Sequence, residues 1–161
     1  MSILRFLALF GFAVILAPSG AVAAGASFSG PSGWSHVAQP ATDPTRKLDQ
    51  WKLGGDATDA GQTVTYISDT SASYDDALGL IKKNFADNHI KPTVDADKTC
   101  QGKQGHVVEF MFGPAGKEVI INRLLVPEGT GLVTITYSRA KDYGFDDDVK
   151  KAIDTFCSAT Q

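Results

Sequence analysis

The spacing of hydrophobic residues changes along the chain, and the first part of it follows the period of β-strands. Residues 33–39 and 46–53 are typical of short strands, and residues 61–68 alternate and are rich in β-branched side chains. We therefore predict an N-terminal group of three strands. The segment PATDPT between the first two contains Pro40 and Pro44. We expect these prolines to prevent regular pairing between those two strands, because proline has no backbone N–H to donate.

A helical period follows within residues 71–89. Its apolar residues are spaced i, i+4, i+7 and i+11, and they are Tyr74, Leu78, Ile81 and Phe85. This spacing puts them on one face of a helix. Ser73 and Asp76 form a variant of the capping box at the start of that helix. We predict the helix despite Gly79, which costs about 1 kcal/mol relative to alanine in a helix interior.

The C-terminal half returns to strands and then closes with a second helix. Residues 106–112, 117–126 and 131–140 are apolar segments joined by the glycine-bearing turns GPAG and PEGTG, which predicts a three-stranded antiparallel meander. Residues 146–157 form the closing helix, and the pattern leaves open whether residues 91–96 add another strand. The fold class predicted is α+β, a mainly antiparallel sheet with two helices packed on it.

The first 23 residues have the three-part pattern of a secretory signal peptide. Arg5 precedes an apolar run over residues 6–17, and the small residues Ala21-Val22-Ala23 follow a Pro-Ser-Gly break. The run is too short to cross a hydrocarbon core of about 30 Å, so we expect no stable membrane anchor after processing. We predict cleavage after Ala23, with Ala26 as the alternative. The product is a single α+β domain, residues 24–161, that is secreted or periplasmic.

Composition narrows the choice of partners. The formal net charge is −3, and loss of Arg5 with the signal peptide makes it −4. No run of lysine or arginine is long enough to form a phosphate-binding stripe. We expect no binding to nucleic acid, and the partner is an unknown protein or small ligand.

The two cysteines, Cys100 and Cys157, are predicted to form one disulfide bond, because an exported chain matures where thiols oxidise. Val149, Ile153 and Phe156 lie on one helical face, and Cys157 shares that face. In the chain-entropy model, a bond between the two cysteines would stabilise the fold by roughly 4 kcal/mol, because it closes a loop in the unfolded chain. We expect the two Cα atoms to lie roughly 4.4–6.8 Å apart.

The stretch DADKTCQGKQGH around Cys100 contains residue types that bind metal ions. If Asp95 is position 1 of a calcium loop, then Asp97 and Thr99 fit positions 3 and 5. However, Cys100 stands where glycine is required, and His106 stands where a bidentate glutamate is required. His36, His89 and His106 are scattered, without a zinc spacing. We therefore expect no metal or cofactor, and a structural, hydrogen-bonded role for His106.

No catalytic constellation is found either. GPSGW is not a nucleophile elbow, and Lys117 in GPAGKE is not followed by the Ser or Thr of a phosphate loop. A disulfide-bonded Cys100 is no nucleophile for His106. Glu109 alternates with Val108 and Phe110, so we expect those two to face the core and Glu109 to face solvent. The predicted set of catalytic, cofactor-binding and metal-ligating residues is therefore empty.

The two tryptophans, Trp34 and Trp51, lie in or beside the N-terminal strands. A large aromatic residue there either fills the core or anchors a partner. We favour the core, and an exposed indole in an apolar patch would instead locate a binding surface.

The element order, the export signal, the tryptophan near the mature start and the helix between two antiparallel strand groups resemble the α/β sandwich of the PsbP-like family. The resemblance covers residues 33–157. That family includes extrinsic accessory subunits of photosynthetic complexes and a Ran-binding import factor, so the resemblance implies noncatalytic binding and assigns no residues. We expect an exported binding or accessory protein. The alternative is a small extracytoplasmic hydrolase, which requires a pocket with at least two convergent ionisable groups.

Overall fold

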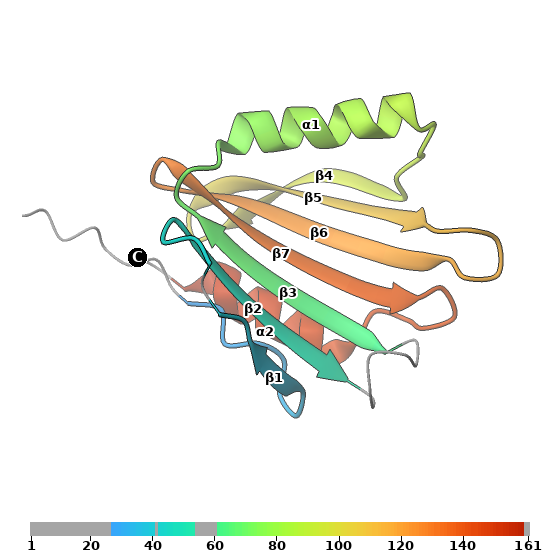
Figure 1. The fold of residues 1–161 in the computed structure, drawn as a ribbon, viewed down its shortest axis with the longest axis horizontal. Helices are drawn as coiled ribbons and strands as arrows, with labels where there is room; N and C mark the ends of the chain where they lie inside the picture. The colour runs from blue at the N-terminus through green and yellow to red at the C-terminus, as the bar shows by residue number, and fades with distance from the viewer. Residues whose placement is uncertain (1–26, 41, 54–60, 160–161) are drawn as a thin grey trace, which may run out of the picture.

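The computed structural model describes residues 27–40, 42–53 and 61–159. The predicted signal peptide and both cleavage sites lie outside the described residues. Within these ranges nine elements follow one another (Figure 1): β1 (Ser35–Ala38), β2 (Arg46–Leu53), β3 (Gln62–Asp69), α1 (Tyr74–Asp87), β4 (Val94–Cys100), β5 (Lys103–Phe112), β6 (Val119–Glu128), β7 (Gly131–Ala140) and α2 (Asp147–Ser158). The α+β class is confirmed, and the segment left open at residues 91–96 contributes the start of β4.

All strands belong to one antiparallel sheet in the order β1-β2-β3-β7-β6-β5-β4 (Figure 1). The predicted meander is confirmed, because β5 pairs with β6 and β6 pairs with β7. The expectation about the prolines is wrong. β1 pairs with β2 from Ser35 opposite Lys52 to Ala38 opposite Asp49, because Pro40 and Pro44 lie in the connection and take no position in the ladder.

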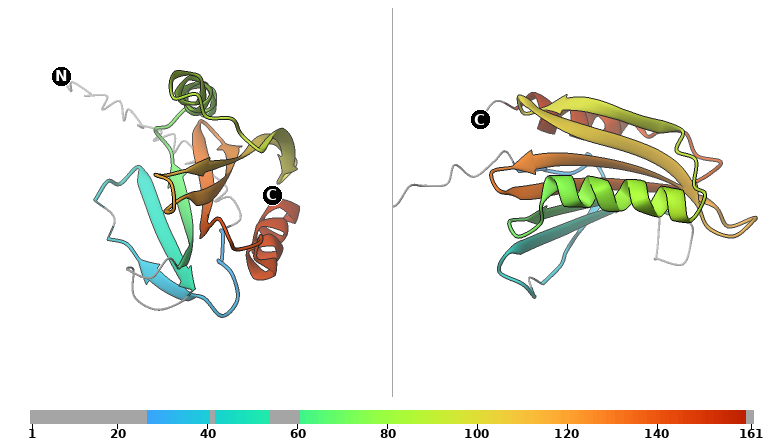
Figure 2. Two further views of the ribbon diagram at one scale, coloured as in Figure 1. Left: turned by 90° about the vertical axis from the view of Figure 1, so that its right-hand side faces the viewer. Right: turned by 90° about the horizontal axis from the view of Figure 1, so that it is seen from above.

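The strand register divides the sheet into two faces, each packed against one helix, and Figure 2 shows the helices on opposite sides. The α1 face carries Val108 and Phe110 of β5 and Ile121 of β6, which pack with α1. The α2 face carries Leu124 of β6 and Ile135 of β7, which pack with α2. Side chains alternate between faces along each strand, so every central strand contributes to both.

Helix α1 follows the predicted capping and has one buried residue. The Ser73 hydroxyl oxygen accepts a hydrogen bond from the backbone N–H of Asp76 at 3.3 Å. Phe85 is the buried residue of the helix. Its ring meets Phe110 edge-on at a centroid distance of 4.9 Å, with Ile81 packed beside it.

Helix α2 is bound more tightly to the sheet. The Asp146 carboxylate caps its start by accepting from the N–H groups of Asp148 and Val149. Its buried residues are Val149, Ile153 and Phe156, as the spacing predicted. No helix in the described ranges is long and apolar enough to cross a membrane.

The predicted disulfide is confirmed. Cys100 at the end of β4 is bonded to Cys157 in the last turn of α2. Their Cα atoms lie 4.1 Å apart, slightly closer than expected. The backbone N–H of Gln101 also donates to the carbonyl of Cys157 at 2.7 Å, so the edge of the sheet and the end of α2 are joined twice.

An aromatic cluster fills the core beneath α2. Trp34 and Trp51 are buried, at 8% and 6% exposure, so both fill the core and neither is a surface anchor. Phe28 meets Trp51 edge-on at 5.2 Å and stacks with Tyr66 at 5.9 Å. Burial is the main cause that raises the pKa of Tyr66 to about 12. Gly30 has a φ of +77°, and a β-carbon there would overlap the Trp51 indole.

Candidate functional site

A polar cluster on the α1 face joins the edge strand β4 to β5. Asp97 lies directly opposite His106 in the β4–β5 ladder, because the turn at Gln101 and Gly102, both with positive φ, returns the chain at once. His106 Nδ1 is 2.9 Å from an Asp97 oxygen, and Nε2 is 2.7 Å from an Asp95 oxygen. The imidazole is buried at 5% exposure, whereas both carboxylates reach solvent.

The chemistry of this cluster is that of a clamp. Ionised carboxylates only accept hydrogen bonds, so a ring nitrogen of His106 that carries a proton donates to the carboxylate beside it. These contacts occupy both ring nitrogens and fix the imidazole against β4. The hydrogen bond from His106, followed by one from Gln104, lowers the pKa of Asp97.

The geometry of the cluster is not that of a metal-binding group. Among residues 27–40, 42–53 and 61–159, no group of three His, Cys, Asp or Glu side chains is arranged to hold a metal ion. Thr99, which fitted position 5 of a calcium loop, does not take part in the two contacts that join His106 to Asp95 and Asp97. His36 lies elsewhere, 2.9 Å from Asp49. The structural role expected for His106 matches its burial and hydrogen bonds.

Glu109 does not face solvent, which corrects the expectation from alternation. Val108 and Phe110 point to the α1 face, so Glu109 points to the α2 face. There it accepts a charge-assisted hydrogen bond from Arg139 Nη2 at 3.1 Å and a longer one from the Asn122 amide at 3.5 Å. Alternation separates the two faces of a strand, but in this sheet both are covered.

The Glu109–Arg139 pair forms an enclosed structural network. The Arg139 guanidinium lies over the rings of Tyr137 and Phe145, with its central carbon about 5 Å from each ring centroid. Its Nε donates to the carbonyl of Tyr143 at 3.1 Å. Nη1 is buried and has no hydrogen-bond partner. Because no solvent reaches that nitrogen, it offers nothing to a ligand.

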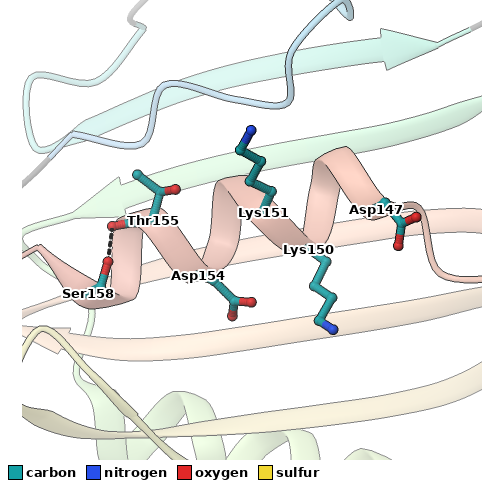
Figure 3. Close-up of a pocket in the computed structure, with 6 residues that line it drawn as sticks. All are labelled: Asp147, Lys150, Lys151, Asp154, Thr155 and Ser158. Atoms are coloured by element: carbon teal, nitrogen blue, oxygen red, sulfur yellow. Dashed lines mark hydrogen bonds between the residues drawn. The ribbon is translucent and has the colours of Figure 1, made fainter.

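The outer surface of α2 carries a shallow depression of about 490 Å³. Figure 3 shows its lining: Asp147, Lys150, Lys151, Asp154, Thr155 and Ser158. Lys150 and Asp154 point to one side of the helix and Lys151 points to the other (Figure 3). All six residues come from α2 and are exposed. Mixed charges on one solvated helix do not converge on a ligand, so this surface is not the candidate site.

The candidate site is a groove between α1 and the sheet. It has a volume of about 360 Å³ and is lined by Leu80, Ile81, Asn84, Phe85, Phe110, Phe112, Ile121 and Arg123. Two apolar residues in its wall are largely exposed, Leu80 at 68% and Phe112 at 59%. Clefts that bind small molecules are concave and mostly apolar, with a few polar groups that orient the ligand. The groove has this character.

Arg123 is the charged residue in the groove. It lies on β6 opposite Val108 of β5 and Thr136 of β7. Its Nε donates to the Thr136 hydroxyl at 3.2 Å. No carboxylate of the described residues forms an ion pair with it. Burial alone lowers the pKa of this guanidinium. We call the eight lining residues the Arg123 groove.

Sequence reasoning did not find the Arg123 groove. Leu80 falls outside the apolar face defined by Tyr74, Leu78, Ile81 and Phe85, and the sequence offers it as an isolated surface leucine. Arg123 interrupts the apolar segment KEVIINRLLV. An arginine inside a strand core was the one available signal, since arginine is almost never buried without a partner.

No known protein family and no curated protein sequence matches the chain. Solved structures do resemble it. LpqN of Mycobacterium tuberculosis, described as involved in cell envelope biogenesis, aligns with a TM-score of 0.54 and 10% identity over 83% of this chain and 80% of its own. Protein PA94 of Pseudomonas aeruginosa, a protein of unknown function and putative regulator, aligns with a TM-score of 0.50 and 11% identity, over 67% and 83%. At this identity the likeness is one of fold alone.

Proposed function

We propose that this chain is a noncatalytic, extracytoplasmic binding protein of the PsbP-like fold type, and that the Arg123 groove is its binding site. The observation that carries the proposal is the open apolar groove, with Leu80 and Phe112 left largely exposed beside the guanidinium. Exposed apolar surface gathered in a concavity is typical of interaction sites.

Export is supported by two features of the chain. The chain has the disulfide bond Cys100–Cys157, and disulfide bonds persist in oxidising compartments and are rare in the cytosol. The N-terminal residues carry the pattern of a cleavable signal peptide. The cell-envelope description of LpqN agrees with an accessory role outside the cytoplasm.

A hydrolase is the weaker candidate. Hydrolysis by side chains requires at least a nucleophile or activated water and a proton acceptor close together. The Arg123 groove contains one ionisable residue. His106 is held by two carboxylates through both ring nitrogens, and none of the residues lining the groove belongs to that cluster.

A small molecule is favoured over a protein partner by the shape of the site. The groove is a bounded volume between a helix and a sheet, at the lower end of the roughly 300–1,000 Å³ common for small-molecule pockets. A stable protein interface needs about 800 Å² on each partner. Leu80 and Phe112, the two largely exposed apolar residues of the groove, supply only a small part of such an area.

The test is saturable binding of a neutral hydrophobic dye, N-phenyl-1-naphthylamine, to the oxidised protein lacking residues 1–23. We expect one site per chain and at least tenfold weaker binding in Leu80→Asp. The matched control is Met111→Asp, which places the same charge at an exposed apolar residue of the α2 face. Absence of saturable binding, or equal loss in both variants, would show that the groove is not the site.

A further inference from the structure

Taking the groove as the binding site proposed above, we infer that its ligand is a single unbranched acyl chain with one carboxylate head, a free fatty acid, whose carboxylate pairs with Arg123. The inference rests on that proposed function and adds the chemical class of the ligand. Two features of the Arg123 groove support it: apolar walls that can hold the acyl chain, and the Arg123 guanidinium, which has no ion-pair partner among the described residues and can hold the carboxylate head.

The cation is available. Arg139, the other arginine of the central sheet, is paired with Glu109. Arg123 is half-buried, and its Nε donates a hydrogen bond to the Thr136 hydroxyl. Nη1 and Nη2 form the end of the guanidinium, a planar fork that matches the two oxygens of a carboxylate. A bound anion would compensate a charge that burial now disfavours.

The size and walls of the Arg123 groove suit a single acyl chain. Its walls are aliphatic and aromatic, with Ile81 and Phe85 from α1 and Phe110 and Ile121 from the sheet. A volume of about 360 Å³ is small for a ligand site, which favours a single-chain amphiphile over a two-chain lipid. Leu80 and Phe112 at the rim would be covered by the methylene groups of the bound chain, and their burial would contribute to affinity.

The head group is a carboxylate because the groove supplies one positive charge. No lysine lines it, and a doubly charged phosphate would be left partly uncompensated in a half-buried site. Hydroxyl groups lie on the same face beside Arg123, since Thr136 of β7 is paired with Thr65 of β3. Neither threonine lines the groove, and the Thr136 hydroxyl holds the guanidinium in place by accepting from its Nε at 3.2 Å.

The experiment compares dodecanoate with dodecanol, which have equal chains and differ in charge. Both are titrated below their aggregation limits, by displacement of N-phenyl-1-naphthylamine and by calorimetry, at pH 8. We expect dodecanoate to bind wild-type protein at least tenfold tighter than dodecanol. In Arg123→Gln the two ligands should bind equally, and in Arg123→Lys the preference should be intermediate, because the charge remains but the fork is lost.

The outcomes separate the two proposals. Equal binding of both ligands to the wild type overturns the carboxylate inference and leaves the groove as a neutral apolar site. Failure of both ligands and of the dye overturns the proposed function itself. The wild-type comparison needs no variant, so it decides the question even if Arg123→Gln does not fold. Arg46→Gln, at an exposed arginine of β2, is the control for a general change in charge.

Discussion

The two faces of the sheet are built from alternate residues of the same strands, yet they are closed to different degrees. The α2 face holds a core of fourteen buried residues, and its helix contributes three of them and a disulfide bond. The α1 face holds a cluster of three buried residues, to which its helix contributes Phe85. The α2 face is cross-linked and leaves a pocket of about 130 Å³ beside its helix, whereas the groove on the α1 face measures about 360 Å³.

This difference separates stability from binding. Apolar burial stabilises in proportion to the area removed from water, so most of the folding free energy comes from the α2 face. The α1 face can leave Leu80 and Phe112 exposed because the fold does not depend on their burial. A binding site placed there can change without loss of the core.

The largest expected effect tests directly whether the α2 face contributes more to the free energy of folding than the α1 face. Phe156→Ala removes a ring that meets Phe28 edge-on at 6.0 Å, and we expect it to lower the free energy of unfolding by about 4–5 kcal/mol. Phe85→Ala should cost about 3 kcal/mol or less, because its cluster is smaller and opens to the groove. Urea denaturation of both variants measures the difference, and equal costs would contradict the comparison.

Removal of the disulfide is expected to have the next largest effect. The bond joins residues separated by 57 positions, for which the chain-entropy model gives about 4 kcal/mol. Cys100→Ser and Cys157→Ser should lower the free energy of unfolding by similar amounts, since either opens the same loop. The double variant should match each single one. Clear additivity of the two would mean that the cysteines act separately.

The Glu109–Arg139 network gives a third, smaller effect. Glu109→Ala leaves the buried Arg139 charge without its partner, and we expect a loss of about 3 kcal/mol in the free energy of unfolding. Lys83→Ala, which removes an exposed pair with Asp87, is the control and should change the denaturation midpoint little. If Glu109→Ala is as mild as this control, Glu109 is solvated after all.

The His106 clamp predicts a change in acid stability. The folded-state pKa of Asp97 is lowered, so the stability it contributes is complete above the unfolded pKa of about 4. It is lost as the pH falls through the folded value. In Asp97→Asn, the free energy of unfolding should therefore fall less steeply below about pH 4 than in the wild type. Parallel pH profiles of the two proteins would contradict the clamp.

The smallest expected effect is at the groove rim. Leu80→Ser should change the free energy of unfolding by no more than about 0.5 kcal/mol, because the side chain is already exposed. The same variant should weaken dye binding several-fold. Thermal unfolding and dye titration of one sample measure both. A marked loss of stability would mean that Leu80 belongs to the core.

The elements and the cross-link were predictable from local sequence. Periods of two and of 3.6 residues located six of the seven described strands and both helices, and they left the segment of β4 open. Ser73 marked the start of α1, and Cys157 on the apolar face of α2 indicated the bond to Cys100. These features depend on residues a few positions apart or on compartment chemistry, so they can be deduced without a fold. The signal peptide stays a prediction.

Only the tertiary structure decided where the polar residues point and what they meet. Glu109 was misplaced because alternation identifies two faces but does not show that both are covered. The clamp on His106 depends on the β4–β5 register, and the unpaired Arg123 depends on how far α1 reaches across the sheet. Local periodicity determines which side chains share a face. The long-range pairing of strands and the docking of helices determine which parts of that face remain open to a ligand.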